Sequence, residues 1–329
     1  MVGEQAEMNL STNRELYCWI CCGETPPADR GFLPGQIESC RAYWNDLKNF
    51  SKEKNLLEAN FNGKTEQTFH SSFWELYLPK AFDVAGIRLF RGKEGQPDFY
   101  FEKGGQEIWL EAVACGEPQE QNAVPPPGED FESNTDGFYA NQTMRAMATA
   151  IDSKIKKWND GYKRNVHEEP ASFVIALNGW RALNRHFDAA FPDDPPMITK
   201  TLFGMGDLWL SRHGQNISQC YKHAEKTKPL QDGGNGAPIA HFKNPANKEI
   251  AGVLYSAANI FETRCDIFGH DFIFVQNPHA ADVSTVFNSM QVKESLDLAA
   301  GLKPVPIWRL DLRTGKVLRS EPQEPCHGG

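Results

Sequence analysis

The segment Gln106–Ala114 constrains the fold of this chain more than any other part of the sequence. From residue 108 it reads Ile-Trp-Leu-Glu-Ala-Val-Ala, so that Glu111 is the one acid in an apolar run. A strand that is apolar on both faces is typical of a sheet covered on both sides. Because it is the single carboxylate within this apolar run, Glu111 is a candidate functional residue.

Helical and strand-like periodicities alternate along the rest of the chain. Within 138–158 the apolar residues recur at spacings of three, four and seven, which predicts an amphipathic helix. Helices that precede and interleave short strands favour an α/β fold, with a mixed central sheet flanked by helices. We expect helices at 37–50, 52–60, 66–84 (with Pro79 as a candidate break) and 138–158, strands at 87–90, 98–102, 106–114, 172–176, 251–255, 272–275 and 307–312, and a strand pair within 198–212.

Composition divides the 329 residues into three parts. Residues 1–60 read as an N-terminal extension with cysteines and helices, 61–320 as the α/β domain, and 321–329 as a C-terminal tail. Within the domain, 116–136 is acidic and proline-rich, which is typical of a surface loop.

The net charge of −9 argues against a surface that coats nucleic acid broadly, because such a surface needs dispersed lysine and arginine. It is compatible with a local basic groove beside a cluster of acids. The sequence has no apolar run long enough to span a membrane and no basic start followed by an apolar stretch. We therefore expect a cytoplasmic protein without a membrane partner.

Four of the eight cysteines lie close together in the sequence: Cys18, Cys21, Cys22 and Cys40. The first two have the spacing of a metal knuckle. Zinc sites usually show two such pairs, and the second pair is missing here. Small buried thiols are therefore favoured over a structural Zn²⁺ at these four residues.

Glu75 is a second notable acid, because all its neighbours in Phe-Trp-Glu-Leu-Tyr-Leu (73–78) are apolar or aromatic. A carboxylate in such a segment is expected to be partly buried, which costs free energy unless the group is paired, hydrogen-bonded or near a cation. A bridged core carboxylate is the alternative to a functional acid.

A hairpin is expected to bring Asp98 and Glu111 together, since Gly104-Gly105 separates their two strands. Asp98 follows Pro97 at the start of the first strand, and Glu111 lies late in the second. Two like charges at close range are unfavourable unless a cation neutralises them. Mg²⁺ prefers one or two carboxylates completed by water and phosphate oxygens, so this pair suits that ion.

The order Glu75, Pro97-Asp98 and Glu111 resembles the PD-(D/E)xK nuclease superfamily over about residues 65–176. The run from FWELYL (73–78) to FVIALNG (173–179) is also similar to uncharacterised bacterial proteins assigned to that superfamily. The resemblance implies a restriction-endonuclease-like core and Mg²⁺- or Mn²⁺-dependent hydrolysis of nucleic acid, most simply by a DNA endonuclease in restriction or defence. Asp98 and Glu111 would hold the metal, and Glu75 would bind a second ion or position a water. Cutting both DNA strands would favour a homodimer.

The chain departs from this pattern at position 113, where Val113 replaces the motif lysine. Some members of the superfamily supply the lysine from the following helix, and Lys154 is the candidate here, at the border of the apolar stripe of that helix. The alternative is that Lys154 is solvated like its neighbours. The resemblance also makes three basic residues candidate phosphate contacts: Arg145, Lys156 and Lys157.

Two other functions remain open at this point. The missing lysine favours an inactive nuclease fold that binds nucleic acid or a partner protein. A structural or assembly protein would instead pair the acids with lysine or arginine. The sequence contains no HExxH zinc motif, no GxSxG elbow and no phosphate-binding loop that would indicate another enzyme class.

Overall fold

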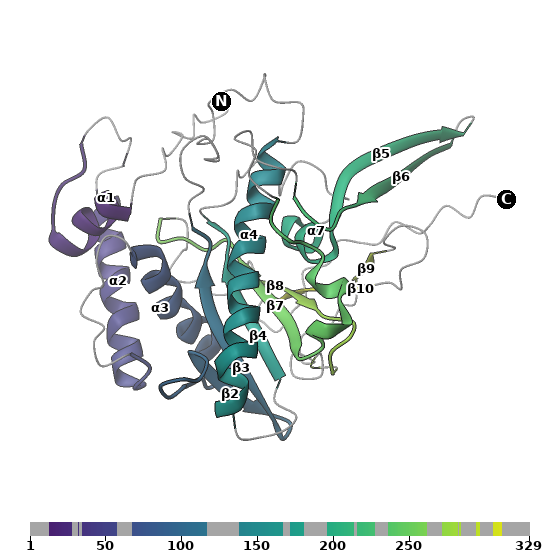
Figure 1. The fold of residues 1–329 in the computed structure, drawn as a ribbon. Helices are drawn as coiled ribbons and strands as arrows, with labels where there is room; N and C mark the ends of the chain where they lie inside the picture. Colours follow the sequence, from purple (N-terminus) through teal and green to yellow (C-terminus); the bar gives the residue numbers. More distant parts are fainter. Residues whose placement is uncertain are drawn as a thin grey trace.

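An eight-stranded mixed sheet with helices on both faces forms the centre of the fold (Figure 1). The three central strands β3, β4 and β7 run parallel, and every other neighbouring pair is antiparallel. In sheet order the strands are β1 (Phe90–Arg91), β2 (Phe99–Lys103), β3 (Gln106–Ala114), β4 (Ser172–Asn178), β7 (Ile250–Ser256), β8 (Phe272–Gln276), β10 (Val305–Leu310) and β9 (Glu294–Leu296). The computed structural model describes residues 13–27, 32, 35–57, 68–116, 138–166, 172–180, 196–213, 216–227, 236–261, 272–281, 283, 294–296 and 305–310.

Alternation along the strands divides the interior into two apolar cores, one on each face of the sheet. On β3, Ile108 and Leu110 belong to the core beneath the N-terminal helices, whereas Trp109 belongs to the core beneath α4 (Phe138–Lys157). On β4 every residue is buried. The α/β class and the flanked mixed sheet expected from the sequence are therefore confirmed.

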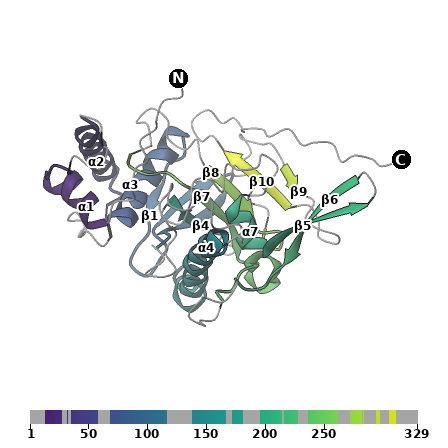
Figure 2. The same cartoon turned by 90° about the horizontal axis from the view of Figure 1, so that it is seen from above.

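The first helical layer consists of α1 (Asn13–Tyr17), the π-helical turn η1 (Cys18–Cys22), α2 (Gln36–Glu53) and α3 (Phe69–Val84). All four lie on one side of the sheet (Figure 2). Their apolar residues share one core with β2, β3 and β8, so the described part of the N-terminal extension packs against the α/β domain.

Trp74 fixes α3 to the centre of the sheet. Its Nε1 donates a hydrogen bond to the carbonyl oxygen of Ala176 at 2.8 Å, and the side chain is fully buried.

Trp74→Phe keeps the aromatic contacts but leaves that buried carbonyl without its donor. We expect the free energy of unfolding to fall by about 1–3 kcal/mol. Urea denaturation checks this value, and an unchanged midpoint would contradict it.

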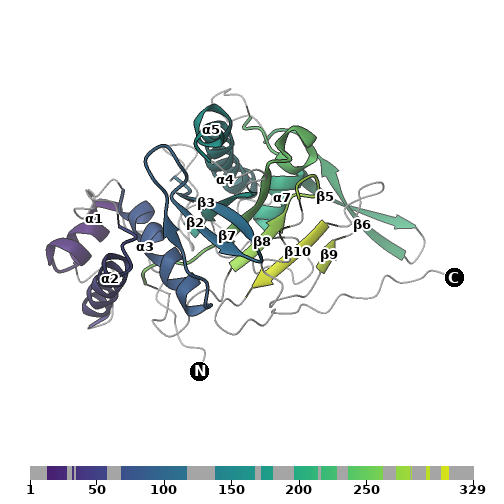
Figure 3. The same cartoon turned by 90° about the horizontal axis from the view of Figure 1, so that it is seen from below.

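The second helical layer covers the opposite face with α4, the π-helical turn η5 (Trp158–Tyr162), α5 (Lys163–Asn165) and α7 (Met197–Phe203) (Figure 3). The amphipathic stripe expected for 138–158 is present, since Met147, Ala148 and Ile151 are fully buried. Trp158 continues this stripe and stacks on Phe173 of β4, with ring centroids 4.4 Å apart.

Three local expectations were wrong. The helix expected to break before residue 52 is one helix to Glu53, after which Asn55 turns the chain with φ 61°. Pro79 lies inside a continuous α3. The first half of 198–212 is helix rather than strand: α7 ends at Gly204 (φ 61°), a left-handed position that suits glycine, and the strand begins only after it.

The strands β5 (Met205–His213) and β6 (Asn216–His223) form a separate antiparallel ribbon that projects from the body (Figure 1). Short 3₁₀ turns η7 (His241–Lys243) and η8 (Pro245–Asn247) precede β7. Among the described residues, none of the helices is long and apolar enough to cross a membrane. The tail at 321–329 and most of the loop at 116–136 lie outside the described residues.

Candidate functional site

The β2–β3 hairpin sets Asp98 opposite Glu111. Its two-residue turn, Gly104-Gly105, has φ values of 63° and 78°, which glycine adopts without strain and which the type I′ hairpin turn requires. This turn fixes the register in which Phe99 pairs with Leu110. Asp98, one residue before Phe99, therefore meets Glu111, one residue after Leu110.

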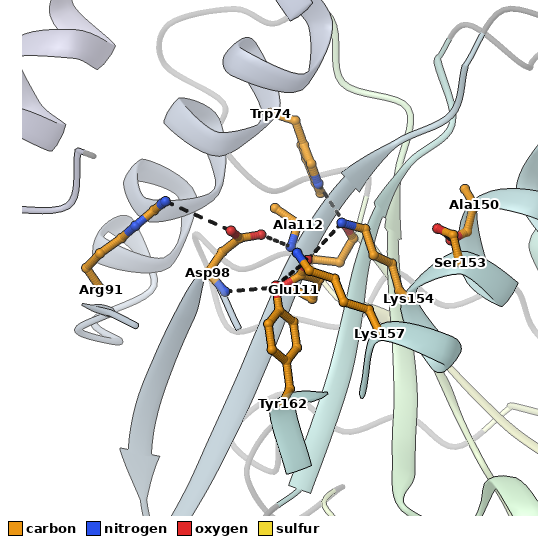
Figure 4. Close-up of polar contacts among 11 residues, drawn as sticks. Trp74, Arg91, Asp98, Glu111, Ala112, Ala150, Ser153, Lys154, Lys157 and Tyr162 are labelled. Atoms are coloured by element: carbon orange, nitrogen blue, oxygen red, sulfur yellow. Dashed lines mark hydrogen bonds and ion pairs between the residues drawn. The ribbon is translucent and has the colours of Figure 1, made fainter. Parts of the chain in front are cut away.

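Hydrogen bonds cross between the two acids and the facing backbone (Figure 4). The backbone N–H of Ala112 donates to Asp98 Oδ2 at 2.9 Å, and the backbone N–H of Asp98 donates to Glu111 Oε2 at 3.3 Å. Each carboxylate thus accepts a hydrogen bond from the partner segment. These bonds keep both acids at the open end of the hairpin, away from its glycine turn.

Glu111 is held by three donors on its other oxygen. Its side chain is only 1% exposed. Oε1 accepts hydrogen bonds from Lys154 Nζ at 2.8 Å, Lys157 Nζ at 2.9 Å and the Tyr162 hydroxyl at 3.2 Å (Figure 4). A buried carboxylate requires such compensation, and two ammonium groups supply more positive charge than one carboxylate neutralises.

These three donors come from the end of α4 and from the wider π turn η5 that follows it. Lys154 follows Ile151 by three positions and precedes Trp158 by four, so it shares the face that packs on the sheet. Beyond Lys157 the chain makes the wider π turn of η5. That turn brings Tyr162 beneath Lys157, whose Nζ lies 4.6 Å from the centre of the tyrosine ring.

Asp98 is electrostatically strained. Burial, followed by the charges of Glu111 and Glu75, raises the pKa of Asp98 to about 7. The Arg91 guanidinium and the Ala112 N–H act in the opposite direction. Arg91 is a distant partner, since its Nη2 lies 3.9 Å from Asp98 Oδ1. The existing cations therefore leave part of the negative charge at Asp98 uncompensated.

Glu75 approaches the pair from the other helical layer. It is half-buried on α3, directly after Trp74. Because its charge contributes to the raised pKa of Asp98, the two carboxylates lie within electrostatic reach of each other. The structure thus joins Asp98 and Lys154 to Glu111 through hydrogen bonds, and Glu75 lies within electrostatic range of Asp98.

The three predicted phosphate contacts lie in different places. Arg145 is half-buried roughly two and a half turns, or about 14 Å, before Lys154 on α4. Lys156 points outward, with its side chain 70% exposed, and pairs with Asp152 at 2.7 Å. Lys157 bonds to Glu111, so the structure places it within the carboxylate site.

The carboxylate oxygens of Asp98 and Glu111 are suitable ligand atoms for a hard divalent cation. Both acids offer only oxygen, the ligand that Mg²⁺ and Mn²⁺ prefer, and the raised pKa of Asp98 reflects negative charge that a cation would neutralise. No group of three or more histidine, cysteine or acidic side chains in the described part of the chain is arranged to hold a metal. Two carboxylates are nevertheless sufficient for Mg²⁺ when water and phosphate complete its shell.

The cysteines named in the sequence are free thiols in the structure. Cys18, Cys21 and Cys22 share the turn η1, whereas Cys40 donates from α2 to the carbonyl oxygen of Ile260 at 3.5 Å. Burial and the neighbouring Cys22 raise the pKa of Cys21 to about 12. Without a bound cation this thiol therefore keeps its proton at neutral pH.

Comparisons with protein-family models, curated proteins and solved structures found no match to this chain. The functional argument therefore rests on the site geometry. Sequence reasoning missed Tyr162 and the bond from Lys157 to Glu111. Lys157 had a signal, because it follows Lys154 by three positions on a helix. Tyr162 had none, because its place depends on the π turn.

Proposed function

We propose that this chain is a metal-dependent nuclease that hydrolyses phosphodiester bonds, with Asp98 and Glu111 as the ligands of Mg²⁺ or Mn²⁺. One observation carries the proposal: two acids face each other at the end of a hairpin, and a lysine from a neighbouring helix bonds to one of them. The restriction-endonuclease-like core is part of the same proposal. Asp98 and Glu111 would hold the divalent ion, which would supply polarisation of the phosphate and a lowered pKa of a bound water.

Lys154 is proposed to fill the place of the lysine absent at position 113. Val113 is half-buried in the core beneath α4, on the face of β3 that also carries Glu111. The ammonium of Lys154 reaches that face from the helix and lies 2.8 Å from Glu111 Oε1. At this position it would orient the attacking water and stabilise negative charge on the phosphate. Glu75 would position a water or a second ion.

DNA is the proposed substrate, cut within the strand and in the context of restriction or defence. The chain as a whole is acidic, but three cations, Arg91, Lys154 and Lys157, lie beside the acids of the site. This arrangement suits a phosphate backbone approaching one point of the surface. Cleavage of both strands would require two such sites, so a homodimer is part of the proposal.

A second candidate is an inactive nuclease fold that binds nucleic acid or a partner protein. The observation in its favour is that both oxygens of Glu111 already accept hydrogen bonds within the chain. An ion cluster of this kind holds α4 on the sheet without any chemistry. The two candidates differ in whether the chain cleaves nucleic acid.

The test is cleavage of plasmid DNA and single-stranded RNA with Mg²⁺ or Mn²⁺. We expect wild type to cut DNA, Asp98→Ala and Glu111→Ala to abolish cutting, and Lys154→Met to slow it about a hundredfold. Lys54→Met is the control, because that exposed lysine pairs with Asp83 rather than with the acids of the site. If wild type cuts neither substrate and calorimetry shows no metal binding, the nuclease proposal is contradicted.

A further inference from the structure

Two lysines bond to the same oxygen of Glu111, but they lie at different depths. The exposed fraction of the side chain is 18% for Lys154 and 49% for Lys157. Lys154 is held within the packed face of α4. Lys157 lies above the ring of Tyr162, and about half of its side chain is exposed to solvent (Figure 4). Lys157 is therefore the lysine that can move away at lower cost.

The formal charges of the site balance before any metal binds. Arg91, Lys154 and Lys157 contribute three positive charges, and the acids Glu75, Asp98 and Glu111 contribute three negative charges when ionised. A divalent ion adds two positive charges beside the same carboxylates. Repulsion between this ion and the ammonium groups would then weaken the ion pairs that Glu111 forms with Lys154 and Lys157. The half-exposed lysine is the one expected to leave.

We propose that Lys157 is the internal counter-ion of the metal-free site, and that it contacts a phosphate of the nucleic acid once a divalent cation has displaced it from Glu111. This inference rests on the proposed nuclease function. The inference gives the two lysines different roles. Lys154 stays bonded to Glu111, whereas Lys157 leaves that carboxylate and contacts a phosphate.

The surroundings of Lys157 fit a phosphate partner. A displaced Lys157 ammonium carries three donors, and its side chain is already half-exposed to solvent. The Tyr162 hydroxyl donates its single proton to Glu111 Oε1, so the donors available to a phosphate come from Lys157. Lysine is a common contact to phosphate oxygens.

Calorimetric titration of the full chain with Mn²⁺ tests the counter-ion. Lys157→Met removes the competing cation, so we expect Mn²⁺ to bind at least about tenfold more tightly than to wild type. Lys157→Arg keeps the cation and should bind like wild type. Lys156→Met, which removes an exposed lysine paired with Asp152, should leave the affinity unchanged.

Binding of a labelled DNA duplex in Ca²⁺ tests the phosphate contact. For Lys157→Met we expect about threefold to tenfold weaker binding and a salt dependence reduced by about one contact. If Mn²⁺ binds Lys157→Met no more tightly than Lys156→Met, the counter-ion role is overturned while the metal site stands. Tighter Mn²⁺ binding with unchanged DNA affinity would overturn the phosphate contact. If neither wild type nor Lys157→Met binds Mn²⁺, the proposed function fails as well.

Discussion

Asp98→Asn is expected to stabilise the folded chain at pH 8, although it alters a buried polar residue. The pKa of Asp98 is raised from 3.8 to about 7 in the folded state, first by burial and then by Glu111 and Glu75. Between these two values the folded chain holds a proton that the unfolded chain has released. Stability therefore falls as the pH rises from about 4 to about 7 and stays low above that range.

The size of this effect follows from the pKa difference. About three pKa units correspond to at most about 4 kcal/mol, which the Asp98→Asn variant would recover because the asparagine side chain carries no charge. Asparagine also keeps an acceptor for the Ala112 N–H.

Urea unfolding of wild type and Asp98→Asn at pH 5 and pH 8 measures the effect directly. We expect Asp98→Asn to be more stable than wild type by about 1–2 kcal/mol at pH 5 and by up to about 4 kcal/mol at pH 8. Asp83→Asn serves as the control, because Asp83 is an exposed partner of Lys54 and its loss should change stability little at either pH. Equal pH dependence in wild type and Asp98→Asn would refute the raised pKa.

Glu111→Gln is expected to lower the free energy of unfolding by about 3 kcal/mol. The substitution keeps the shape of the side chain but removes the charge that compensates Lys154, whose ammonium is only 18% exposed. The loss lies at the low end for breaking a buried pair, because removing this charge also relieves its repulsion with Asp98. Urea denaturation at pH 7 provides the measurement.

A second substitution shows whether the loss comes from the orphaned lysine. Adding Lys154→Met to Glu111→Gln removes the uncompensated charge and should restore part of the stability. The matched control is Glu249→Gln, because the Glu249–Lys163 pair is more exposed and should contribute less than about 1 kcal/mol. A loss in Glu111→Gln no larger than in this control would show that the ion cluster does not stabilise the fold.

Much of the sheet was predictable because its signals are local. The apolar run of Gln106–Ala114 matches β3 residue for residue, and the two glycines of the turn fix the register that sets Asp98 opposite Glu111. The periodicity of 138–158 predicted α4 within one residue of its observed end. The segment 198–212 failed, because a short apolar run fits helix and strand equally well until its ends are known.

The sequence by itself determined which face each of these side chains occupies, since the period of two on β3 and of 3.6 on α4 depends only on the backbone. Only the tertiary structure decided which atoms meet. Lys154 and Glu111 are 43 positions apart, and their contact depends on how α4 lies across the sheet. The burial that raises the pKa of Asp98 also depends on the tertiary structure. Both the contact and this burial depend on packing between segments distant in the sequence, where local periodicity carries no information.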